Sequence, residues 1–120
     1  MSTNAILAYP NTDGTIHATY VHYDGYIEHT GRMLANHYND GVAAHSICHA
    51  GYLSCVEPTL KESVENSVNR SKPSVYESLD QMLNDLSDGP IEYIYLWTMN
   101  GKWVVLSDQH NVYSVNSEAA

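Results

Sequence analysis

Phenylalanine is absent from this 120-residue chain, basic residues are scarce, and no apolar run approaches the ~20 residues that cross a bilayer. Five Lys and Arg stand against 14 Asp and Glu, which gives a formal net charge of -9. A surface of this sign repels nucleic-acid phosphates and anionic lipids. We therefore expect no direct binding to nucleic acid and no membrane association.

Several motifs of common catalytic chemistry are also missing. The sequence has no nucleophile elbow, no Gly-rich phosphate loop and no Walker-type lysine. Its N-terminus lacks the basic region and the apolar stretch of a signal peptide. We expect no cofactor, we lean against an enzyme, and we expect the protein to stay in a bacterial host cytoplasm. In that reducing compartment Cys48 and Cys55 should be free thiols.

Two β-hairpins are the clearest strand signals in the sequence. Residues 4–9 and 15–23 are rich in β-forming residues, and the segment between them contains Pro10 and ends in Asp-Gly, which favours a turn. Residues 91–98 and 102–107 are joined by Asn100-Gly101, both of which tolerate a positive φ. Each pair should form an antiparallel hairpin.

Helical spacing of apolar residues dominates the middle of the chain. It predicts helices over about 28–38 and 42–50, and a short third helix after the capping box of Thr59 and Glu62. A second capping box, Ser74 and Glu77, predicts a fourth helix up to Gly89-Pro90.

These elements predict an α+β fold in a single domain, residues 1–120. We expect a two-layer arrangement in which two hairpins form an antiparallel sheet of about four strands and three to four helices pack mainly on one face. Beyond Asp108 we expect one further turn or short strand, and residues 116–120 should fray.

Residues 13–38 resemble a group of small, largely uncharacterised phage and prophage accessory proteins. The resemblance rests on the His-aromatic-Asp-Gly-Tyr segment from His22 to Tyr26, which follows a strand and precedes a Gly-containing helix. The later GYLSCV segment and the closing hairpin extend the similarity, and residues 57–73 look like an insertion. The resemblance implies a phage origin, and it carries over no catalytic residue.

An acidic helix face is the first candidate for a binding site. Glu77, Asp85 and Asp88 lie opposite the apolar stripe of the fourth helix, with Asp80 beside them. We expect this face to mimic phosphates and to occupy a basic groove on a host protein, inhibiting a defence or nucleic-acid-processing factor. A solvated face with no partner is the structural alternative.

A second candidate, from a different functional class, is a site for a small ligand or nucleotide, or a hydrolase site. It would use His22, Asp24 and Arg32 beside Tyr23 and Tyr26, at a strand end where acid/base pairs are often built. The same residues also fit a simple Asp-Gly turn.

Metal binding is a weaker alternative. His45, Cys48 and His49 share one side of a predicted helix, and Cys55 could supply a fourth ligand, but a second ligand pair is missing. A structural or self-assembling role through a sheet edge also remains open, as does a homodimer.

Overall fold

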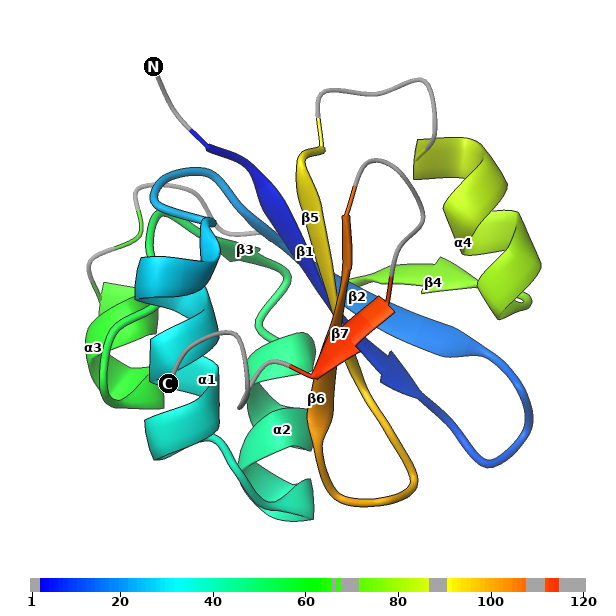
Figure 1. Ribbon diagram of the computed structural model, residues 1–120, viewed down its shortest axis with the longest axis horizontal. Helices are drawn as coiled ribbons and strands as arrows, with labels where there is room; N and C mark the ends of the chain where they lie inside the picture. The colour runs from blue at the N-terminus through cyan, green and yellow to red at the C-terminus, as the bar shows by residue number, and fades with distance from the viewer. Residues whose placement is uncertain (1–2, 66, 68–71, 87–90, 108–111, 115–120) are drawn as a thin grey trace.

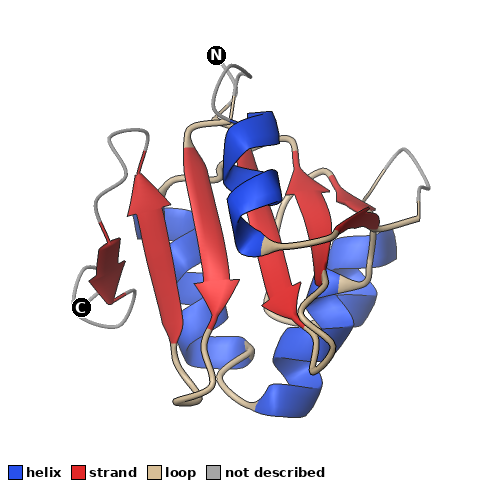
Figure 2. Ribbon diagram, turned by 90° about the vertical axis from the view of Figure 1, so that its right-hand side faces the viewer, coloured by secondary structure: helices blue, strands red, loops and turns tan. Residues whose placement is uncertain are grey.

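The computed structural model describes residues 3–65, 67, 72–86, 91–107 and 112–114. These residues form one central sheet with helices on both faces (Figures 1 and 2). The predicted frayed tail at 116–120 lies outside the described residues, as does Asp88. No helix within the described ranges has the length and apolarity needed to cross a membrane.

Both predicted hairpins are present. The first pairs β1 (Ala5–Pro10) with β2 (Ile16–Val21), and the second pairs β5 (Tyr93–Trp97) with β6 (Trp103–Ser107). At the second turn Gly101 adopts a positive φ of 75°, whereas Asn100 does not, so only one of the two turn residues uses the expected backbone conformation.

The predicted all-antiparallel, four-stranded sheet is wrong, because the sheet that the described residues form is mixed and has seven strands. Its order is β3-β2-β1-β5-β6-β7, and β4 pairs with β2 as well. The hairpins meet through β1 and β5, which run parallel, with Ala5 opposite Tyr93 and Ala8 opposite Leu96. Alternation of side chains looks the same in parallel and antiparallel strands, so the pattern that located the strands could not give their relative direction.

Three short strands complete the sheet. β3 (Tyr52–Leu53) runs parallel to the end of β2, and β4 (Ser74–Tyr76) pairs antiparallel with its beginning. β7 (Val112–Ser114) pairs with β6 at the other edge, where a turn or short strand was expected.

The helices divide between the two sheet faces. One face is covered by a continuous helical segment, η1 (Ile27–Gly31) and α1 (Arg32–His37), by α2 (Gly41–Cys48) and by α3 (Leu60–Glu65). Helix α4 (Leu79–Leu86) lies alone on the opposite face (Figure 2). The sheet therefore has two apolar cores, a larger one that includes Trp103, Tyr95 and Leu34 and a smaller one centred on Met82.

One capping box is confirmed and the other is displaced. The Thr59 hydroxyl accepts a hydrogen bond from the Glu62 backbone at 3.1 Å and donates one to the Glu62 carboxylate at 3.0 Å, so α3 begins as predicted. Ser74 lies in β4 instead of capping a helix. The cap of α4 is Ser78, whose hydroxyl accepts from the Gln81 backbone at 3.1 Å. Two Ser-x-x-Glu/Gln patterns four residues apart made the two starts indistinguishable by pattern.

Candidate functional site: a cluster of Asp24, His29 and Cys55

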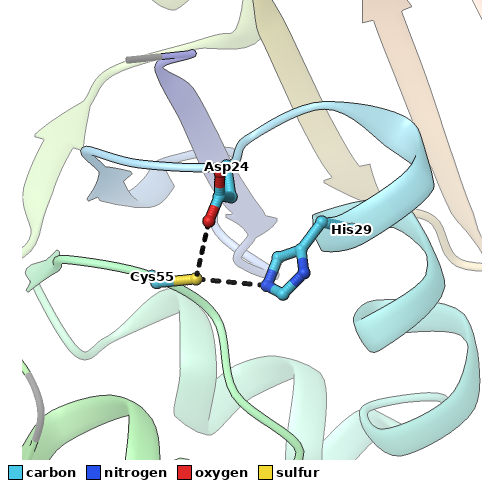
Figure 3. A group of neighbouring side chains, drawn as sticks. All are labelled: Asp24, His29 and Cys55. Atoms are coloured by element: carbon cyan, nitrogen blue, oxygen red, sulfur yellow. Dashed lines mark hydrogen bonds between the residues drawn. The ribbon is translucent and has the colours of Figure 1, made fainter. Parts of the chain in front are cut away.

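Three side chains from separate segments converge where β2 and β3 end (Figure 3). The Cys55 sulfur lies 3.1 Å from His29 Nε2 and 3.8 Å from Asp24 Oδ2. One ligand atom from each residue, a sulfur, a nitrogen and an oxygen, lies within 4.8 Å of the other two. Asp24 is exposed, whereas His29 and Cys55 are half-buried, so the cluster is open to solvent on one side.

Pairing between the ends of two strands brings Asp24 beside Cys55. The two segments stay together beyond the last paired residues of β2 and β3. The Tyr23 backbone N–H donates a hydrogen bond of 2.8 Å to the Ser54 carbonyl. The next residue in each segment is a member of the cluster. Neighbouring strand ends therefore present a carboxylate and a thiol to the same space.

The turn that carries Asp24 is held in an unusual backbone conformation. Asp24 has a φ of 57°, the only positive φ recorded for a described residue other than glycine. Its carbonyl accepts a 2.7 Å hydrogen bond from the Thr30 hydroxyl, and the Gly25 N–H donates to Thr3. A non-glycine residue in this region costs free energy and is enriched at functional sites, so the turn is pre-organised by its surroundings.

His29 is presented by a π-helical turn. Residues Ile27–Gly31 form η1, and the chain continues directly into α1. Single π-helical turns are rare and often occur at functional sites. The His29 ring on this turn points toward Cys55 (Figure 3).

A backbone carbonyl adds a fourth donor atom to the cluster. The Val56 carbonyl oxygen lies 2.9 Å from His29 Nε2 and 3.7 Å from the Cys55 sulfur. Since a carbonyl can only accept, Nε2 carries the imidazole proton in this arrangement. Coordination of a metal through Nε2 requires the other tautomer, with the proton on Nδ1, and leaves the Val56 oxygen free to approach the same ion.

The electrostatic surroundings of Cys55 favour a cation. Burial, followed by the negative charges of Glu57 and Asp24, raises the pKa of the Cys55 thiol to about 12. A thiol of this kind remains protonated at neutral pH and is a poor nucleophile. A divalent cation would offset both carboxylates, and a coordinated thiol loses its proton.

The predicted ligand site is only partly assembled. Asp24 belongs to the cluster, and the ring of Tyr26 lies 6.3 Å from that of His29. His22 and Tyr23, two further residues of the predicted site, pack against each other, with ring centroids 4.3 Å apart. The Arg32 side chain is exposed and forms no ion pair with another described residue.

The predicted metal ligands on α2 are divided between the core and the surface. Cys48 is fully buried, and burial raises its pKa well above the usual value. His45 and His49 stack at 3.9 Å, and the His49 ring bonds to the His45 carbonyl through Nδ1. Cys55 joins the Asp24 cluster instead of these residues.

The predicted acidic face is largely exposed. Glu77 immediately precedes the α4 cap, and Asp80 and Asp85 lie on the helix with exposed side chains. Asp88 falls outside the described residues. The three described carboxylates thus remain available for a partner.

No protein-family model, curated protein sequence or solved structure matches this chain. The cluster is therefore interpreted from its geometry alone. Sequence reasoning missed His29 because its partners are five and twenty-six positions away, on no common helix face or strand. The Asp-Gly turn was the one available signal, because it located Asp24 at a strand end.

Proposed function

We propose that the protein binds a divalent metal ion of borderline softness, such as Zn²⁺, through Asp24, His29 and Cys55. The observation that carries the proposal is the convergence of a carboxylate oxygen, an imidazole nitrogen and a sulfur within 4.8 Å. Zinc bond lengths of about 2.0 to 2.3 Å place tetrahedral ligands roughly 3.3 to 3.7 Å apart. Two of the three separations in the cluster, 3.1 Å and 3.8 Å, bracket that range, and the third, between Asp24 and His29, is within 4.8 Å.

The donor set also supports a particular class of metal. Thiolate and imidazole ligands suit Zn²⁺, Co²⁺ and related ions, whereas Mg²⁺ and Ca²⁺ prefer oxygen ligands alone. Three protein side chains leave a coordination position for water, the Val56 carbonyl or an external ligand. Three-ligand zinc sites with an open position are typical of ligand binding and catalysis, and closed four-ligand sites are typical of structural zinc.

Isothermal titration of the purified protein with Zn²⁺, and melting curves with and without the metal, test this proposal. We expect one ion per chain and a raised melting temperature, since an ion that binds only the folded state stabilises it. Replacement of Cys55 with Ala, or of His29 with Ala, should weaken binding by more than the roughly 10- to 100-fold loss typical of outer-shell residues. Cys48→Ala is the matched control, because it removes a thiol buried in the core. Equal binding by the wild type and Cys55→Ala would contradict the proposal.

We further propose that the acidic residues Glu77, Asp80, Asp85 and Asp88 bind a host protein with a basic groove. This proposal is supported by the exposure of the three described carboxylates on and beside α4. Carboxylates presented together can occupy a surface that is complementary to phosphates. Such a partner would be a defence or nucleic-acid-processing factor of a bacterial host.

A pull-down from bacterial lysate at low and moderate salt tests this second proposal. The wild type should capture a stoichiometric, salt-sensitive partner. The variant in which all four acidic residues are replaced by Lys should not capture it. A control variant with Glu28 and Glu65 replaced by Lys makes half that charge change away from α4 and should keep the partner. Capture that is unchanged by the four-residue reversal would contradict a role for this face.

A further inference from the structure

Two exposed tyrosines flank the turn that carries the proposed metal ligand Asp24. Tyr23 is 49% exposed and Tyr26 is 37% exposed, which places both among the large apolar side chains that the fold leaves open. The Tyr26 ring lies 6.3 Å from the ring of His29, at an interplanar angle of 56°. One of these rings therefore lies directly beside a proposed metal ligand.

The other tyrosines with clear structural roles differ from this pair. Tyr38 and Tyr95 are buried and donate hydrogen bonds of 2.7 Å from their hydroxyls to backbone carbonyls. Neither Tyr23 nor Tyr26 has a side-chain hydrogen bond within the described part of the chain. Hydrogen bonding among the described residues thus does not account for the two exposed rings.

The aromatic surface continues from Tyr23 along the strands. The His22 ring meets the Tyr23 ring edge to face at 4.3 Å and lies 6.3 Å from that of Tyr52, which is paired in register with Tyr20. The Tyr20 and Tyr52 rings are 5.7 Å apart. These rings form a row along β2 and β3, and Tyr20 packs against the smaller apolar core on the α4 face of the sheet.

Charge restricts the kind of molecule that can reach this surface. The chain carries a net charge of -9, and Asp24, one of the proposed ligands, contributes a carboxylate to the site itself. A divalent ion coordinated by one carboxylate and one thiolate leaves no excess positive charge to attract a polyanion. The open position therefore favours a neutral or singly charged ligand.

On the basis of the proposed metal site, we propose that its open position takes a small planar aromatic molecule. The molecule binds the metal through a nitrogen or oxygen donor, while its ring packs against Tyr26 and Tyr23. Aromatic rings prefer offset or edge-to-face contacts, and such pairs contribute beyond the area that they bury. The exposed tyrosines thus select the ligand, and the metal anchors it.

Binding of two hydroxamates to the Co²⁺-loaded protein tests this inference. Benzohydroxamate and acetohydroxamate share the metal-binding group and differ in carrying a phenyl ring or a methyl group. Changes in the visible spectrum of the bound cobalt report the affinity of each probe. We expect benzohydroxamate to bind about tenfold more tightly to the wild type.

Variants of the two tyrosines test whether their rings cause the tighter binding of benzohydroxamate. Tyr26→Ala and Tyr23→Ala should each reduce the ratio of the two affinities, while Tyr26→Phe should retain it because the ring remains. Met99→Ala removes a fully exposed side chain from the Asn100-Gly101 turn and should leave the ratio unchanged. A readout based on the ratio is insensitive to variants that only weaken the metal site, because both probes lose affinity equally.

The outcomes separate this inference from the proposal on which it rests. A wild-type protein that gives no cobalt spectrum would overturn both the metal site and the ligand class. A clear cobalt spectrum with equal affinities for the two probes would overturn only the aromatic ligand. The same conclusion would follow if both alanine variants kept the wild-type ratio.

Discussion

The hydroxyl of Tyr95 donates a 2.7 Å hydrogen bond to the backbone carbonyl of Gly25, seventy positions earlier in the sequence. Tyr95 lies on the central strand β5 and is fully buried. The bond therefore ties the turn that carries Asp24 to the middle of the sheet. Together with the Thr30 hydroxyl on the adjacent carbonyl, it fixes the backbone around the proposed metal ligand.

Replacement of Tyr95 with Phe should destabilise the fold and weaken metal binding. It leaves the buried Gly25 carbonyl without this donor, which should lower the free energy of unfolding by about 1 to 3 kcal/mol. Urea denaturation measures this loss. The exposed Tyr23→Phe is the control and should change stability little. Equal stability of the two variants would show that the bond does not hold the turn.

Gly25 should not tolerate a side chain. A Cβ built at this position would lie 2.7 Å from the Ala5 Cβ and 2.8 Å from the Thr3 carbonyl oxygen. Gly25→Ala should therefore cost about 1 to 3 kcal/mol in urea unfolding, as overpacking does. Gly41→Ala is the matched control, since a Cβ there meets nothing within 4 Å. If Gly25→Ala were no more harmful than Gly41→Ala, the close approach would be refuted.

The hydrogen bond at the start of α4 predicts that Ser78, and not Ser74, stabilises this helix as its cap. Ser78→Ala removes the acceptor for the Gln81 backbone N–H and should cost about 1 kcal/mol. Ser78→Asp should retain most of the stability, because a carboxylate also caps a helix. Thermal unfolding of the two variants gives the comparison. Similar losses in both would indicate that the cap does not stabilise α4.

Acidification should reduce stability through a histidine stack, in which the His49 ring lies 4.2 Å from that of His17 and 3.9 Å from that of His45. Burial, and then the neighbouring imidazoles, lower the pKa of His17, and the same causes, with His49 as the neighbour, lower that of His45. The unfolded chain therefore takes up these protons more readily than the folded protein. The contribution to stability is complete above pH 6.5 and is lost as the pH falls through the lowered folded-state pKa values.

Urea unfolding at pH 7.5 and pH 5.5 measures this dependence. The His45→Gln variant should show a smaller difference between the two pH values than the wild type. His37→Gln, on α1 and outside the stack, is the control and should keep the full difference. An equal pH dependence in the wild type and His45→Gln would exclude the stack as its source.

Local signals in the sequence predicted most of the elements but not their arrangement. The Asn100-Gly101 turn and the Thr59 cap depend on residues close in the chain, so their positions could be read directly. The parallel pairing of β1 with β5 depends on contacts between residues almost ninety positions apart. No pattern within either strand encodes that choice.

The candidate site was harder to predict for the same reason. Asp24 stood out because an Asp-Gly pair follows a strand, whereas His29 and Cys55 carried no recognisable spacing. Their meeting depends on the π-helical turn, and on the pairing of β2 with β3, which joins residues 32 positions apart in the sequence. His45, Cys48 and His49 have regular helical spacing, but the Cys48 side chain is buried in the core and is not available at the surface.

The central claim is that Asp24, His29 and Cys55 form one metal site, and a Co²⁺ titration followed by ultraviolet and visible absorption tests it most directly. A cobalt ion bound by a thiolate gives a sulfur-to-metal charge-transfer band, which reports the Cys55 ligand itself. We predict that the band saturates at one ion per chain, disappears in Cys55→Ala and persists in Cys48→Ala. A spectrum without the band, or a band that survives in Cys55→Ala, would contradict the account.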